Sequence, residues 1–130
     1  FNANVPNGFE TAIRWAEKFR KPIIITENGI EDSKDHLRPQ YLIEHVHKLW
    51  RAVNLSVPVR GYFHWTLVDN FEWERGWSQR FGLWRLNLQD QTRIKTKSVE
   101  LYSQICGNNY LSSEMIKEFA PQIFSKILPG

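Results

Sequence analysis

Carboxylates follow apolar runs at two places in this sequence. Residues 23–26 form a β-branched run that ends at Glu27, and Asn28-Gly29 follows directly as a turn signal. A second apolar run, residues 61–65, leads into a segment that carries Glu72. A carboxylate at the end of a strand is held rigidly, as a nucleophile or a ligand-binding acid must be. The two places therefore predict a site built on carboxylate chemistry.

The two runs are predicted strands, and a helix is predicted between them. Pro39 opens this helix at a position where its missing N–H costs nothing. Apolar residues then recur at helical spacing and are predicted to form the core-facing side of the helix, namely Leu42, Val46, Leu49 and Val53. Strand, helix and strand in this order predict a parallel βα unit, which gathers the carboxyl ends of its strands on one face. Both carboxylates would lie on that face.

Further elements are predicted on both sides of this unit: a helix over 9–20, a polar loop over 29–38, an extended segment over 81–88 and a helix over 98–106 closed by Gly107. The strand at residues 23–26 is predicted to be buried on both faces, because all of its residues are apolar or β-branched. Residues 108–130 have a weaker apolar pattern, which predicts a segment that packs on a larger body. No internal repeat beyond the βα unit and no linker is found.

An ordered set of short motifs runs through the chain: Thr26-Glu27-Asn28-Gly29, Val59-Arg60-Gly61-Tyr62, Trp65, Asp69-Asn70-Phe71-Glu72-Trp73, Gly76 and Arg80-Phe81-Gly82-Leu83. Together they resemble the C-terminal part of glycoside hydrolase family 1, the retaining β-glucosidases and β-galactosidases. The resemblance covers residues 6–116. Arg38-Pro39, His64 and Gly107-Asn108 resemble most the branch of archaeal and other thermophile β-glycosidases.

The resemblance implies a barrel that 130 residues cannot complete. A (β/α)₈ barrel takes about 250 residues. The expected fold class is therefore α/β, the C-terminal portion of a TIM barrel from about helix six to strand eight and its terminal helix. Residues 1–130 would form one partial domain without a separate second domain. Because two strands leave unpaired edges, we expect the missing N-terminal barrel part as a partner, in cis or in trans.

The resemblance assigns Glu27 the role of catalytic nucleophile. Retaining glycosidases attack the sugar with one carboxylate and use a second, about 5–5.5 Å away, as acid and base. Taken alone, Thr26-Glu27-Asn28-Gly29 would instead be an exposed acid beside a turn. In the family the second carboxylate lies in an Asn-Glu-Pro motif, which this sequence lacks. The chain is therefore expected to carry half of the catalytic pair.

Four residues match the family's pocket for the non-reducing sugar: Trp65, Glu72, Trp73 and Phe81. Aromatic faces suit the C–H patches of a pyranose, and a carboxylate accepts hydrogen bonds from its hydroxyls. Glu72 is thus expected to bind hydroxyls and not to replace the missing acid. Without the resemblance, the aromatic residues would be read as core. Asp69, Asn70 and Arg80 are expected to hold the loop in place.

Composition argues against several other classes of function. The net charge is +3 and the pI about 9.1, but Lys and Arg are scattered, so no nucleic-acid partner is expected. No run of about 18 apolar residues exists, so no membrane span is expected. The single Cys106 fits a reducing compartment and a cytoplasmic location. The four histidines are dispersed and no phosphate-binding loop is present, so neither a metal nor a cofactor is expected.

The predicted activity is hydrolysis of terminal non-reducing β-D-glycosides by double displacement, as part of a complete barrel. Glucosides, galactosides and fucosides all fit the motifs, and the isolated chain is not expected to turn over substrate. An alternative is a non-catalytic fragment that binds sugar through the aromatic loop or assembles with another part of a barrel.

Overall fold

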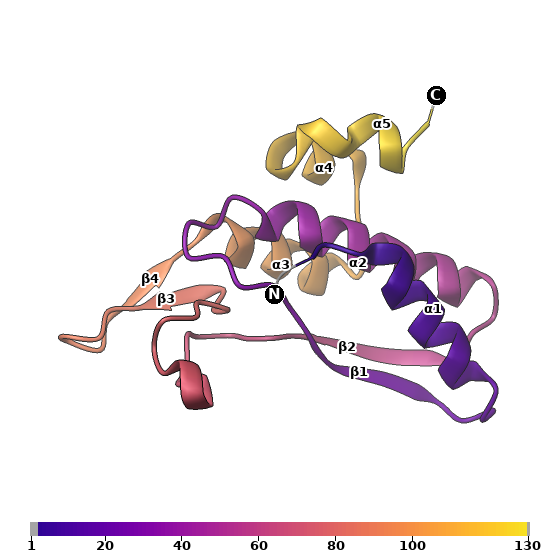
Figure 1. Cartoon of the computed structure of the whole chain (residues 1–130). Coiled ribbons are helices and arrows are strands. Elements are labelled where there is room, and N and C mark those ends of the chain that lie inside the picture. The colour runs from indigo at the N-terminus through magenta and orange to yellow at the C-terminus, as the bar shows by residue number, and fades with distance from the viewer. Residues whose placement is uncertain (1–2, 130) are drawn as a thin grey trace.

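The computed structural model describes residues 3–129 (Figure 1). In chain order the elements are α1 (Pro6–Glu17), β1 (Ile23–Asn28), α2 (Arg38–Asn54), β2 (Val59–His64), the 3₁₀ turn η1 (Trp73–Arg75), β3 (Trp84–Leu86), β4 (Arg93–Lys95), α3 (Lys97–Asn108), α4 (Ser113–Phe119), the 3₁₀ turn η2 (Pro121–Ile123) and α5 (Phe124–Ile127). Figure 1 shows the β1–β2 sheet below, a layer of α1, α2 and α3 above it, and α4 and α5 on top.

The predicted parallel βα unit is confirmed. β1 pairs with β2 in parallel, with Ile23 opposite Val59 and Asn28 opposite His64, and α2 connects the two strands. Both strands end on the left of Figure 1, where η1 and the β3–β4 hairpin also lie. The chain thus brings its strand ends and its long loop to one side of the molecule. β1 runs to Asn28, so the strand is longer than predicted and includes Glu27.

The prediction that the first strand is buried on both faces is wrong for this chain. Ile24 on β1 is 55% exposed and Phe63 on β2 is 60% exposed. A Cβ placed on Gly61 would lie 3.5 Å from the Ile24 side chain and 3.9 Å from that of Phe63, so these residues share one face. Helices cover only the opposite face (Figure 1). The apolar composition of the strands therefore exceeds what this chain buries.

Two apolar clusters hold the helices in place. The smaller one, Ile13, Ala52 and Val57, lies where α1 and α2 pack near the starts of β1 and β2. The larger one joins α2, α3 and the C-terminal helices: Leu42, Ile43, Leu83, Leu101, Ile105, Met115, Ile116, Ala120, Ile123 and Ile127. The segment predicted to pack on a larger body therefore packs, in its apolar part, on α2 and α3 of this same chain.

Two further predictions need correction. Val53, predicted on the core side of α2, is exposed, because the buried side of this helix is the one that carries Tyr41 and Ala52. Gly107 does not close α3. The helix runs to Asn108 and ends at Asn109, whose φ of 56° is left-handed, a conformation that asparagine tolerates better than most residues.

The segment predicted as extended over 81–88 forms a strand only over Trp84–Leu86, paired antiparallel with Arg93–Lys95.

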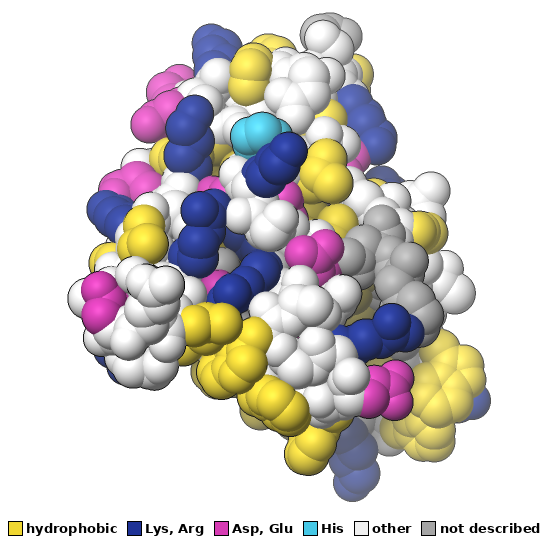
Figure 2. Space-filling view, turned by 60° about the vertical axis from the view of Figure 1, so that its left-hand side comes forward, with side chains coloured by type: hydrophobic (Ala, Val, Ile, Leu, Met, Phe, Trp, Pro, Cys, Tyr) yellow, Lys and Arg dark blue, Asp and Glu magenta, His cyan; other side chains and the backbone are white. Residues whose placement is uncertain are grey.

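The surface mixes charges of both signs on the face that Figure 2 presents, where Lys and Arg side chains are interspersed with acidic, apolar and uncharged ones. Among residues 3–129, no helix combines the length and the apolar character needed to cross a bilayer.

Candidate active site

Asn28 ties the end of β1 to its neighbours. Its side-chain N–H donates to the Tyr41 hydroxyl on α2 at 2.9 Å, and its side-chain oxygen accepts from the Tyr62 hydroxyl on β2 at 2.9 Å. Its backbone carbonyl accepts from the N–H of Trp65 at 3.0 Å. Burial raises the pKa of both tyrosines, to about 12 for Tyr41, so both hydroxyls keep their protons at neutral pH. The backbone beside Glu27 is therefore fixed from three sides.

Gly29 brings the two strand ends into close contact. A Cβ at this position would lie 1.7 Å from the Trp65 carbonyl oxygen, closer than any side chain permits. Glu27, two residues earlier, is exposed, and its carboxylate makes no hydrogen bond or ion pair with residues 3–129. The Thr26-Glu27-Asn28-Gly29 motif thus presents one free carboxylate on a backbone that its neighbours hold.

Trp65 and Glu72 are brought together in the loop that follows β2. The indole Nε1–H of Trp65 donates to Oε1 of Glu72 at 3.3 Å. Trp65 contacts β1 through its backbone, so this pair lies beside the strand end that carries Glu27. A carboxylate has two oxygens, and a neutral donor on one of them leaves the other able to accept from a ligand. The pair suits a ligand rich in hydroxyls.

Asp69 holds the rest of this loop. Its carboxylate accepts from Arg80 Nη1 at 3.2 Å, from the Gly82 N–H at 2.9 Å and from the Leu86 N–H at 3.1 Å. A Cβ on Gly82 would lie 2.3 Å from the Asp69 nitrogen, so only glycine fits there. The predicted loop-holding roles of Asp69 and Arg80 are confirmed. The side-chain oxygen of Asn70 is buried without a hydrogen-bond partner among the described residues, so the same role is not observed for it.

The two remaining aromatic residues differ in their placement. Phe81 is half-buried, and its carbonyl accepts from the Thr66 N–H at 3.2 Å, directly after Trp65. Trp73 begins η1 with a left-handed φ of 47° and is 85% exposed. The chain therefore brings Trp65 and Glu72 into contact and holds the Phe81 backbone against Thr66, whereas the Trp73 side chain is left almost fully exposed.

Two cavities in the described part of the chain lie elsewhere. One of about 330 Å³ is an open hollow lined by α1, α2 and α5, and one of about 440 Å³ is lined by α2, β2 and α3. Within residues 3–129, no group of three or more His, Cys, Asp or Glu side chains is arranged to hold a metal ion.

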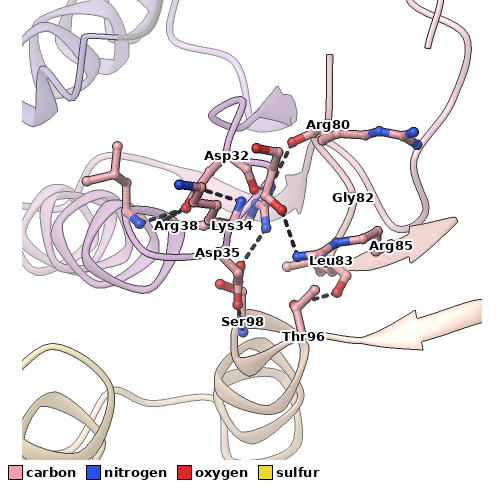
Figure 3. Close-up of polar contacts among 12 residues, drawn as sticks. Asp32, Lys34, Asp35, Arg38, Arg80, Gly82, Leu83, Arg85, Thr96 and Ser98 are labelled. Carbon is pink, nitrogen blue, oxygen red and sulfur yellow. Dashed lines mark hydrogen bonds and ion pairs between the residues drawn. The ribbon is translucent and has the colours of Figure 1, made fainter. Parts of the chain in front are cut away.

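A buried ionic cluster beneath the site was missed by sequence reasoning. Residues 29–38 were expected to be a polar loop, yet Asp32, Asp35 and Arg38 are almost fully buried. Figure 3 shows their side chains converging between α2, the Arg80 backbone and the start of α3. The signal in the sequence was the pair of acids a few residues before an arginine at a helix start, which only the tertiary contacts distinguish from solvated charges.

Residues 2–111 match the profile of glycosyl hydrolase family 1. The chain belongs to glycosyl hydrolase family 1. It is 43% identical over 114 residues to the β-galactosidase of Pyrococcus woesei, covering 87% of this chain and 22% of that protein. It is 38% identical over 118 residues to β-glucosidase A of Thermotoga maritima, covering 82% of this chain and 26% of that protein.

Solved structures of family 1 enzymes have the same fold over this region. The β-glycosidase from Pyrococcus horikoshii superimposes with a TM-score of 0.86 at 33% identity, over 90% of this chain and 28% of that one. That from Thermosphaera aggregans gives 0.83 at 37% identity, over 85% and 23%. The predicted resemblance to archaeal and thermophile family 1 enzymes is confirmed, as is the fold class, an incomplete (β/α)₈ barrel. The chain spans about a quarter of the length of these relatives.

Proposed function

We propose that this chain supplies the nucleophile and the glycone-binding loop of a retaining β-glycosidase. The observation that carries the proposal is the free carboxylate of Glu27 at the end of β1, where Asn28 and Gly29 fix the backbone against β2. The rest of the barrel would supply the acid, in cis or in trans. Residues 1–130 would then be one partial domain, without a second domain of their own.

Each side chain at the strand ends would have a distinct task. Glu27 would attack the anomeric carbon while the acid supplied by the remaining barrel protonates the departing glycosidic oxygen. The same group, now deprotonated, would then act as a base on the water that releases the sugar from Glu27. Glu72, oriented by the Trp65 indole, would accept hydrogen bonds from glycone hydroxyls. Trp65, Phe81 and Trp73 would pack on the C–H faces of the ring. Trp73 would take part once the remaining barrel surrounds it, since it is exposed in this chain.

The proposed substrates are terminal non-reducing β-D-glycosides, with glucosides, galactosides and fucosides as candidates. Relatives of this chain carry the names β-galactosidase and β-glucosidase. We also propose a cytoplasmic location, which the exposed free thiol of the single cysteine, Cys106, supports because such thiols persist in reducing compartments.

A second candidate function is assembly or sugar binding without catalysis. The open sheet face with Ile24 and Phe63 favours assembly with other barrel strands. The two candidates differ in one respect: only the enzyme needs the Asn-Glu-Pro acid, encoded in the same reading frame or in a chain that purifies with this one.

A mechanism-based label tests the proposal. A 2-deoxy-2-fluoro β-D-glucoside with an activated leaving group traps the nucleophile as a stable glycosyl ester. The chain is labelled alone and after co-expression with the N-terminal part of the Pyrococcus horikoshii relative, and intact mass and peptide mapping locate the sugar. We expect an adduct on Glu27 in the completed barrel.

Substitutions sharpen this experiment. Glu27→Gln should give no adduct and lower kcat/KM by about 10³-fold or more. The matched control is Glu74→Gln, an exposed acid in the loop after β2, which should label like the parent. An adduct on another residue, or turnover by Glu27→Gln, would overturn the nucleophile assignment.

A further inference from the structure

Arg38 is a buried cation that joins the loops following the two strands. It is the first residue of α2 and is 1% exposed. Nη1 donates to the Asp35 carboxylate, and Nη2 donates to the carbonyls of Asp32 and Arg80, both at 2.8 Å. Figure 3 shows the guanidinium between these three acceptors. One side chain thus connects the loop after β1 with the loop after β2.

The contact at Arg80 determines where the neighbouring aromatic ring lies. The Arg80 carbonyl accepts a second hydrogen bond, from the Asp32 N–H at 2.9 Å, and the Arg80 side chain binds Asp69. The next residue is Phe81, whose carbonyl is held by the Thr66 N–H. Both peptide groups that flank Phe81 are therefore fixed, one by the Arg38 cluster and one by the end of β2.

The same cluster fixes the two helices. The Asp32 carboxylate accepts from the N–H groups of Leu37 and Arg38, at 2.6 and 3.0 Å, at the start of α2. The second oxygen of Asp35 accepts from the Ser98 N–H at 2.8 Å, at the start of α3. An ionic cluster this deeply buried is seldom the most stable way to fill a core, since well-packed apolar residues often do as well or better. Its directional bonds, however, define positions that apolar packing does not.

We propose that Arg38 is a positioning residue for the glycone site, acting through the Arg80 carbonyl on Phe81. This inference rests on the proposed function. The planar guanidinium donates to all three acceptors at once, which the single ammonium of lysine cannot do with the same geometry. Without the two guanidinium nitrogens that hold these acceptors, the Phe81 segment shifts relative to the strand end that carries Glu27. A displacement of about 1 Å can cost about a hundredfold in rate.

The test is Arg38→Lys in the completed barrel, measured per active site. Titration with the 2-fluoro glucoside counts the working sites, and kcat/KM is measured with 4-nitrophenyl β-D-glucoside and β-D-galactoside. We expect a tenfold to hundredfold loss, about the scale of a misplaced group. We also expect the glucoside to galactoside ratio to change, because Phe81 is proposed to contact the glycone.

Arg85→Lys is the matched control. Arg85 Nη2 donates to the Ser33 carbonyl at 2.6 Å, so this arginine joins β3 to the loop after β1 (Figure 3). It makes no hydrogen bond to the Arg80 carbonyl within the described residues. The kcat/KM per site of Arg85→Lys should stay within about twofold of the parent value, because an exposed polar contact contributes little free energy.

Three outcomes would overturn the inference. In the first, Arg38→Lys has fewer titratable sites, but kcat/KM per site and the glucoside to galactoside ratio equal those of the parent. Arg38 would then have a structural role only. If Arg38→Lys yields no sites, Asp35→Asn decides: it removes the charged partner of Nη1, and a parental ratio and kcat/KM per site would contradict the role. If the parent protein is not labelled at Glu27, the proposed function itself fails, and the positioning role fails with it.

Discussion

At the scale of single residues, His64 links the stability of this chain to pH. It ends β2 and is 9% exposed. Burial lowers its pKa to about 3, the Arg38 cation and His45 act in the same direction, and the Phe81 backbone opposes them. Below about pH 6.5, His64 binds a proton in the unfolded chain but stays neutral in the folded chain until the pH nears 3. The contribution of His64 to stability is therefore complete above pH 6.5 and is lost as the pH falls toward 3.

His64→Gln tests this linkage. Between pH 7 and pH 5 the parent should lose about 2 kcal/mol more unfolding free energy than the variant, the amount that follows from its pKa shift. Urea unfolding at the two pH values measures the difference. His36→Gln, at an exposed position, should behave like the parent. Burial also lowers the pKa of His45 and His47, so a smaller pH dependence of the same sign should remain in His64→Gln. Equal slopes for parent and His64→Gln would contradict the prediction.

How much of the site the sequence predicts depends on how local the contacts are. The loop-holding pair of Asp69 and Arg80 lies within one motif and was expected. The contacts of the Arg38 cluster were not expected, because they join distant parts of the chain. The Arg80 carbonyl is 42 positions from Arg38, and the Ser98 N–H that donates to Asp35 is 63 positions from it. Charges in a loop are usually solvated. The charges of Asp32, Asp35 and Arg38 are buried only because the folded chain packs α2, α3 and the Arg80 backbone around them.

At the scale of elements, the close contact between the ends of β1 and β2 depends on Gly29. Periodicity predicted both strands and the helix between them, but not the distance between the strand ends. That distance leaves no room for a methyl group beside the Trp65 carbonyl. The helix boundaries were harder to predict: α3 ends at a left-handed Asn109 that competes with the glycine two residues earlier.

Gly29→Ala should therefore be destabilising and should displace Glu27. A 1.7 Å approach forces the backbone to move, and the cost should be about 1–3 kcal/mol, as in other overpacked sites. Gly107→Ala is the control, since nothing lies within 4 Å of its added Cβ in α3. It should be neutral or stabilising by up to about 1 kcal/mol, the helix preference of alanine over glycine. Urea unfolding and labelling at Glu27 are the measurements. Equal stability of the two variants would show that the strand ends move apart freely.

At the scale of the whole molecule, the uncovered face of the β1–β2 sheet indicates what this chain lacks. A two-stranded parallel sheet has two unpaired edges, and such edges pair readily with other strands. Ile24 and Phe63 add exposed apolar surface between them. Family 1 relatives are about four times as long, so further barrel strands are the natural cover. The apolar content of the strands, puzzling for 130 residues, is accounted for by the (β/α)₈ barrel.

We therefore expect the chain to associate with the N-terminal part of a family 1 barrel through this face. Co-expression with that part of the Pyrococcus horikoshii relative should give a 1:1 complex, measured by size exclusion with light scattering. Phe63→Asp should weaken the complex about tenfold or more, since it buries an unpaired carboxylate against apolar strands. Leu88→Asp, in the turn of the β3–β4 hairpin, is the control for an added charge and should leave the complex intact. A complex that forms equally well with Phe63→Asp would mean that another surface joins the two parts, and that the open sheet face is covered in some other way.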